Sequence, residues 1–152
     1  MDDKNLAKII NHPGYRISQL VVGVIFILNI SCAVAFIFRP ERYMGGFEIG
    51  GLQGRILTRA MGILFLMWNA TYPLVILNPY RHKTLFAVIL IQQVIGLLGE
   101  SWLMLTLPAG HVALRATGLR FIFFDGAGLI LMSVAYFVLI KQPIRSFDKP
   151  HQ

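Results

Sequence analysis

The stretch RATGLRFIFFDGAG, residues 115–128, carries three charged side chains into an apolar segment that continues to Ile140. An ionisable side chain within a membrane-spanning helix costs roughly 2.5 to 3.5 kcal/mol on insertion scales. Arg120 and Asp125 are therefore expected to face protein or trapped water, and other helices must supply their partners. The stretch predicts an all-α membrane protein whose helices meet around a polar interior.

The composition supports this class. The chain of 152 residues is 56% hydrophobic and its mean hydropathy is +0.65, whereas soluble domains are about 45 to 50% apolar. The net charge of +7 comes from basic residues at the ends of apolar runs, which indicates membrane topology and argues against nucleic acid as a partner. We expect the lipid bilayer as the first partner.

No metal or cofactor is expected. The single cysteine, Cys32, excludes a disulfide framework and a multi-cysteine metal site within one chain. The histidines all lie outside the apolar runs, so no pair of them can hold a haem within the membrane. They are His12, His82, His111 and His151.

Four apolar runs are long enough to cross a hydrocarbon core of roughly 30 Å. They cover residues 17–38, 56–77, 84–107 and 114–140, and they predict a four-helix bundle that forms one transmembrane domain over residues 1–152. Pro73 predicts a kink near Tyr72, and Asn78-Pro79 ends the second run. A short helix in the headgroup region is predicted over residues 3–11.

The connection at residues 39–55 contains five glycines, Gly45, Gly46, Gly50, Gly51 and Gly54. A flexible connection is the favoured interpretation, and a lid over the mouth of the bundle is the alternative. In the third run, Gly96 and Gly99 are expected to let another backbone approach closely.

The basic residues predict the orientation. Both termini and the turn at residues 78–83 share one side, which holds more basic residues than the other and all of the lysines. This bias places both termini in the cytoplasm, in a plasma or inner membrane. The residues on that side are Lys4, Lys8, Arg16, Arg81, Lys83, Lys141, Arg145 and Lys149.

A cluster of polar residues within the runs is the candidate site: Arg59, Asn69, Glu100, Arg120 and Asp125. A rise of about 1.5 Å per residue places Glu100 and Arg120 level, and Asp125 and Asn69 level at greater depth. We predict that Glu100 pairs with Arg120, with Arg59 as a further partner. We predict that Asp125 bonds Asn69 or a bound water.

Two interpretations of this cluster stay open. The polar pairs fix helix register, or they form a site for a proton, an anion or a headgroup. Asp125 is the candidate proton carrier, because burial disfavours a charged carboxylate and the neighbouring Gly126 and Gly128 leave room for a ligand or water. No nucleophile is flanked by a base, which favours a role other than catalysis and leaves a lipid-modifying enzyme as a third alternative.

The chain resembles the DoxX-like group of small four-helix membrane proteins. The resemblance rests on the arginine-led second run with Gly62 and Pro73, on the Asn78-Pro79 turn, and on residues 120–128. It implies a membrane subunit that accompanies redox or quinol-linked enzymes.

The expected function is therefore an accessory or structural subunit, with copies of itself or other membrane subunits as partners. The alternative is a small transporter or ligand-binding protein that handles a proton, a small anion or a lipid headgroup through the Arg, Glu and Asp cluster.

Overall fold

The computed structural model describes residues 13–141, and all regular secondary structure among them is helical. Four segments are long and apolar enough to cross a membrane, as predicted. They are α2 (Pro13–Phe38), the segment Gly51–Leu77, α5 (Lys83–Thr106) and α6 (Val112–Ile140). The second segment begins at Gly51, earlier than the predicted residue 56. The helix predicted at residues 3–11 lies outside the described residues.

The second segment is interrupted where the kink was predicted. It comprises α3 (Gly51–Trp68), the 3-10 turn η3 (Asn69–Thr71) and α4 (Tyr72–Leu77). Pro73 lies in the first turn of α4. A proline lacks the backbone N–H and its ring clashes with the carbonyl four residues earlier, which here belongs to Asn69. The α-helix therefore ends one residue before Asn69.

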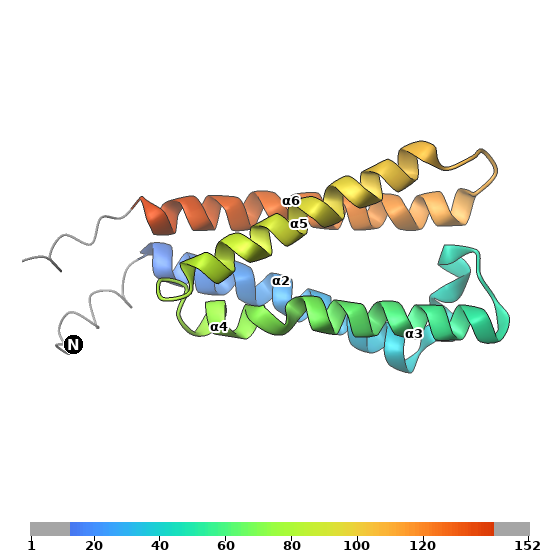
Figure 1. Cartoon of the computed structure of the whole chain (residues 1–152), viewed down its shortest axis with the longest axis horizontal. Helices are drawn as coiled ribbons and strands as arrows, with labels where there is room; N and C mark the ends of the chain where they lie inside the picture. Colours follow the sequence, from blue (N-terminus) through green and yellow to red (C-terminus); the bar gives the residue numbers. More distant parts are fainter. Residues whose placement is uncertain (1–12, 142–152) are drawn as a thin grey trace, which may run out of the picture.

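The helices are arranged as two pairs (Figure 1). Helix α3 packs on α2 and α5 packs on α6, while α2 also packs on α6 and on α4. The start of α2 and the end of α6 lie at one end of the molecule, beside the turn between α4 and α5. We call this the terminal end. The opposite end, where α2 connects to α3 and α5 connects to α6, we call the loop end.

The hydrophobic core fills the half nearer the terminal end. Tyr72, Phe86 and Met132 are fully buried there, and they belong to three different helices. Large apolar side chains cover the outside instead, with Leu105 at 85% and Phe123 at 79% exposure. An apolar exterior of this extent suits helices that face lipid.

A close approach of two helices fixes the first pair. A Cβ atom added at Gly62 of α3 would lie 2.7 Å from the Ala33 carbonyl oxygen of α2 and 2.8 Å from Ile37 Cγ1. Glycine is therefore needed at this crossing, as small residues are at many membrane helix contacts.

The connection between α2 and α3 is folded, so the flexible connection favoured from the sequence is wrong. It forms two short 3-10 turns, η1 (Pro40–Arg42) and η2 (Met44–Phe47). Turn η1 packs on α3, and η2 packs on α6. The connection thereby crosses the loop end of the molecule, which is the position expected for the alternative, a lid.

Candidate functional site: a cavity in the loop half

A cavity of about 500 Å³ lies in the half of the molecule nearer the loop end. Its lining comes from α2, η1, η2, α3, η3, α5 and α6, so every long helix contributes. Cavities of about 300 to 1,000 Å³ with mainly apolar walls and a few converging polar groups are typical of small-molecule sites. This cavity is the candidate functional site.

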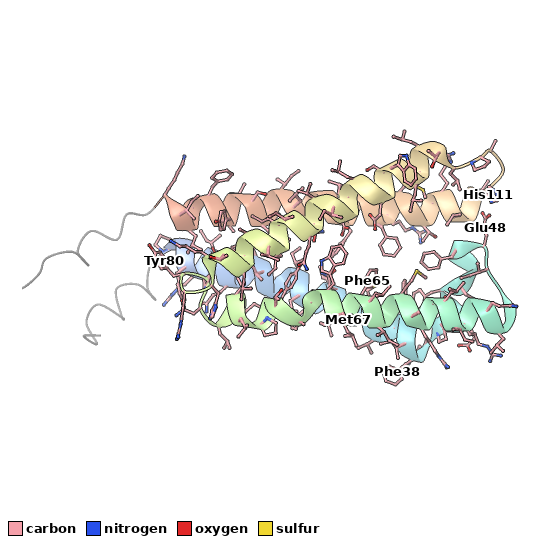
Figure 2. All side chains as sticks on the ribbon, viewed as in Figure 1. Phe38, Glu48, Phe65, Met67, Tyr80 and His111 are labelled. Atoms are coloured by element: carbon pink, nitrogen blue, oxygen red, sulfur yellow. The ribbon has the colours of Figure 1, made fainter. Side chains whose placement is uncertain are left out.

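One wall of the cavity is aromatic. Phe36 of α2 is buried at its centre, with ring centroids 5.1 Å from Tyr43, 5.8 Å from Phe47, 5.9 Å from Phe65 and 6.4 Å from Phe121. Figure 2 shows Phe65 on α3, in the middle of the molecule. The cluster ties α2, η2, α3 and α6 together through edge and offset contacts, each worth about 0.5 to 1.5 kcal/mol beyond the buried area.

The floor of the cavity is polar. The Asn29 amide Nδ2 donates to Asn69 Oδ1 at 3.1 Å, and Asn69 Nδ2 donates to the Phe65 carbonyl at 2.8 Å. Gln93 Nε2 donates to the backbone carbonyl of Asp125 at 3.4 Å. These bonds hold the amides in place and leave part of their hydrogen-bonding capacity for a ligand.

Two carboxyl groups line the same cavity. Glu100 Oε2 is buried and has no hydrogen-bond partner among the described residues. Asp125 Oδ2 would lie 3.2 Å from a Cβ atom added at Gly96, and the Trp68 ring would lie 3.4 Å from it. Gly96 therefore makes room for side chains and not for the backbone predicted from the sequence, and Gly99 meets nothing within 4 Å.

Two arginines complete the lining, Arg120 of α6 and Arg42 of η1. Within residues 13–141, neither guanidinium makes an ion pair or a hydrogen bond. The predicted Glu100–Arg120 ion pair is thus not formed. Equal depth fixes only one coordinate, and contact also depends on the rotation of each helix about its axis, which depth does not give.

The other sequence predictions have mixed outcomes. Asn69, Glu100, Arg120 and Asp125 all line the cavity, so the structure brings four of the five candidates together. The Asp125–Asn69 hydrogen bond is not formed, because Asn69 bonds Asn29 and the Phe65 carbonyl instead.

Arg59 does not line the cavity, and it is exposed. It precedes the cavity-lining Phe65 by six residues and Trp68 by nine. At about 100° per residue it points about 120° and 180° away from these two side chains. The estimated depth of Arg59 placed it near the cluster, but depth does not show on which side of the helix a residue lies.

Glu48 fastens the connection to α6 at the loop end. Its Oε1 accepts hydrogen bonds from the backbone N–H groups of Ala113 and Leu114, both at 3.1 Å, and its Oε2 lies 2.5 Å from His111 Nδ1 (Figure 2). The first N–H groups of a helix have no partner within it, and they favour negative charge. His111 and these N–H groups hold the pKa of Glu48 below its usual range.

Sequence reasoning missed Arg42 as a residue of the site and Glu48 as the residue that fastens the connection to α6. Both lie in the connection taken to be flexible, and Glu48 contacts residues more than 60 positions away. A carboxylate that caps a distant helix has no local signature. The excess of arginine over lysine on this side of the chain was the signal that could have drawn attention to Arg42, because arginine suits fixed anion pairing.

Within residues 13–141, no group of three or more His, Cys, Asp or Glu side chains is placed to hold a metal ion. Comparison of the chain with protein-family models, with curated proteins and with solved structures finds no significant match. The resemblance to the DoxX-like group therefore stays a prediction.

Proposed function

We propose that the four long helices form a membrane-spanning bundle that binds an amphipathic small molecule carrying an anionic group. The cavity carries this proposal, because Arg42 and Arg120 line it without a protein partner while aromatic rings form one of its walls. A carboxylate or phosphate matches the planar guanidinium groups. An apolar body fits the aromatic wall.

The polar floor adds specificity. Asn29, Asn69 and Gln93 are oriented by hydrogen bonds that use only part of their capacity. Glu100 offers a buried oxygen without a partner. A polar group of the ligand, or a water bound with it, would satisfy Glu100, whose unpaired oxygen otherwise carries a desolvation cost of about 1 to 3 kcal/mol.

Hexyl phosphate tests this proposal, because it combines a phosphate with a short apolar chain. We expect it to stabilise the protein in a non-ionic detergent, by about 2.7 kcal/mol at a hundred times its Kd. Hexanol lacks the phosphate and inorganic phosphate lacks the apolar chain, so each should stabilise the protein less than hexyl phosphate does at the same concentration. Arg42→Gln and Arg120→Gln should weaken the effect of hexyl phosphate.

Arg59→Gln is the matched control, because Arg59 is exposed like Arg42 and Arg120 but does not line the cavity. It should leave the response to hexyl phosphate unchanged. Equal stabilisation of the wild type and of both cavity variants would overturn the proposal.

A second proposal, an accessory subunit of a redox or quinol-linked membrane complex, is supported by Arg59. This arginine lies within the second apolar segment, is exposed, and pairs with no acidic group in the described part of the chain. Charge exposed on a spanning helix is costly. A neighbouring subunit, or a second copy of this chain, with a carboxylate at the same depth would offset that cost.

Purification from native membranes tests the second proposal. A partner that copurifies with the wild type and is lost with Arg59→Leu, but kept with Arg120→Gln, supports an accessory subunit. A protein that purifies alone from native membranes contradicts it.

A further inference from the structure

The helices enclose the cavity incompletely. Around the molecule, α3 packs on α2, α2 on α6, and α6 on α5. Near the terminal end α4 packs on α5 and closes the circle, whereas α3 and α5 are not among the closely packed pairs. In Figure 1 the loop half of α5 diverges from α3. The cavity, which is lined from both α3 and α5, lies in this half.

Phe65 and Trp68 of α3 and Gly96 of α5 line the cavity on this side, and Gly99 follows Gly96 by three residues on α5. We call the space between these residues the α3–α5 opening. At its inner limit the Trp68 ring reaches Gly96. Gln93, which points to α6, and Gly99 lie about 60° to either side of Gly96 around the axis of α5. Gly99 is therefore on the side turned away from α6, where it is exposed and has no neighbour within 4 Å.

Access from the water at the loop end is restricted by the connection. Gly46 is so close to Thr117 of α6 that a Cβ atom there would lie 2.8 Å from the hydroxyl oxygen. The Phe47 ring stacks on Phe121 with centroids 6.2 Å apart. Glu48 binds the first N–H groups of α6. Three consecutive residues thus fasten η2 to α6, above the cavity.

From these observations, and resting on the function proposed above, we infer that the ligand is an anionic phospholipid that enters from the bilayer through the α3–α5 opening. Arg42 and Arg120 bind its phosphate near the loop end, where a headgroup lies. The aromatic wall holds the upper part of an acyl chain, and the rest of the chain leaves between α3 and α5. A lipid suits this cavity because α3 and α5 both line it but do not pack closely on each other, so an acyl chain between them would reach the bilayer.

Trp68 is a built-in reporter for this inference, because it borders the opening and lines the cavity. The chain has two tryptophans, and the other, Trp102, is 65% exposed, so Trp102→Phe leaves Trp68 alone with little effect on packing. Bromine on an acyl chain quenches tryptophan fluorescence at short range. The experiment uses phosphatidylcholine vesicles that contain a small share of brominated phosphatidylglycerol or, in a matched sample, of brominated phosphatidylcholine.

We expect brominated phosphatidylglycerol to quench Trp68 more than brominated phosphatidylcholine does, and Arg120→Gln to abolish the difference. Gly99→Phe should narrow the opening and reduce quenching by the anionic lipid while keeping the response to hexyl phosphate, which shows that the cavity is intact. Gly23→Phe is the control, because Gly23 on α2 also has no neighbour within 4 Å and does not line the cavity.

The outcomes separate this inference from the proposed function. If the two brominated lipids quench Trp68 equally and hexyl phosphate still stabilises the protein, the ligand is not an anionic phospholipid. A water-soluble anion then remains as the ligand. Selective quenching that is unaffected by Gly99→Phe overturns the route between α3 and α5. If neither selective quenching nor stabilisation by hexyl phosphate is found, both the inference and the proposed function are wrong.

Discussion

Glu48 and His111 meet at the loop end, with Oε2 of Glu48 2.5 Å from Nδ1 of His111. Glu48 adopts a left-handed conformation with φ of 55°, which is uncommon for a residue other than glycine. This conformation turns the carboxylate toward the first N–H groups of α6. One side chain thereby fixes both the end of η2 and the start of the last helix.

This contact predicts a pH dependence. The pKa of Glu48 is lowered from 4.5 in the folded protein, first by the hydrogen bond to His111. A lowered pKa means that the stabilisation is fully present above about pH 4.5 and is lost as the pH falls through the lower folded value. Glu48→Gln should therefore reduce the Tm at pH 7, and the difference from wild type should shrink at acidic pH.

Glu41→Gln is the control for that measurement. Glu41 pairs with Arg55 at 3.8 Å, and both side chains are about half exposed, so this pair should contribute little at any pH. A difference between wild type and Glu48→Gln that stays constant from neutral to acidic pH would contradict the capping role of the charge.

The helices were predictable because long apolar runs and prolines act locally. The runs predicted all four segments that are long and apolar enough to cross a membrane, and Pro73 predicted the interruption of the second. The connection at residues 39–50 was not predictable, because its fold depends on Phe47 and Glu48 meeting residues of α6 that lie far along the chain. Glycine content indicates freedom of the backbone but not whether distant contacts restrict it.

The sequence predicted how deep the candidate residues lie along their helices, but not the direction in which each side chain points. Counting residues from helix ends placed Asn69, Glu100, Arg120 and Asp125 at similar depths, and all four line one cavity. It could not give the rotation of each helix about its axis, which decides contacts. For this reason the prediction included Arg59, which does not line the cavity, and paired Glu100 with Arg120, which form no ion pair.

Because Glu100 and Arg120 do not pair, the effects of changing each of them on the free energy of unfolding should add. In a direct ion pair, each single change leaves the other charge without its partner, so the double change costs much less than the sum of the two single changes; Glu100 and Arg120 form no such pair. Glu100→Gln and Arg120→Gln should therefore give a double variant whose unfolding free energy, measured in mixed micelles, equals the sum of the two single effects. A double variant much more stable than this sum would show that the two side chains do pair.

Gly62 should be the least replaceable glycine in the spanning segments. In Gly62→Ala the new methyl group would press on the Ala33 carbonyl and on Ile37, and overpacking of this kind costs about 1 to 3 kcal/mol. Gly99→Ala is the matched control: its methyl group meets open space, and alanine favours a helix interior by about 0.5 to 1 kcal/mol. The two variants should shift the Tm in opposite directions.

The orientation can be tested with a single introduced cysteine. In a Cys32→Ser background, cysteine at His82 should resist an impermeant thiol reagent in intact cells, because the bias of lysines predicts a cytoplasmic turn. Cysteine at Gly45 should be labelled, since Gly45 is exposed at the loop end and has no neighbour within 4 Å. The reverse pattern would invert the topology.

We expect Asp125 to matter more for function than for folding. Its carboxyl group lines the cavity beside Gly96, while its backbone carbonyl accepts the bond from Gln93. Asparagine has the same shape and keeps that backbone contact, so Asp125→Asn should accumulate at the wild-type level. It cannot exchange a proton or present a carboxyl group to a ligand. Expression in a strain that lacks the gene should therefore fail to restore the wild-type phenotype, whereas Glu41→Gln, at an exposed carboxylate outside the cavity, should restore it. Full rescue by Asp125→Asn at wild-type abundance would show that the carboxyl group of Asp125 is not needed for function and that the residue has only a structural role.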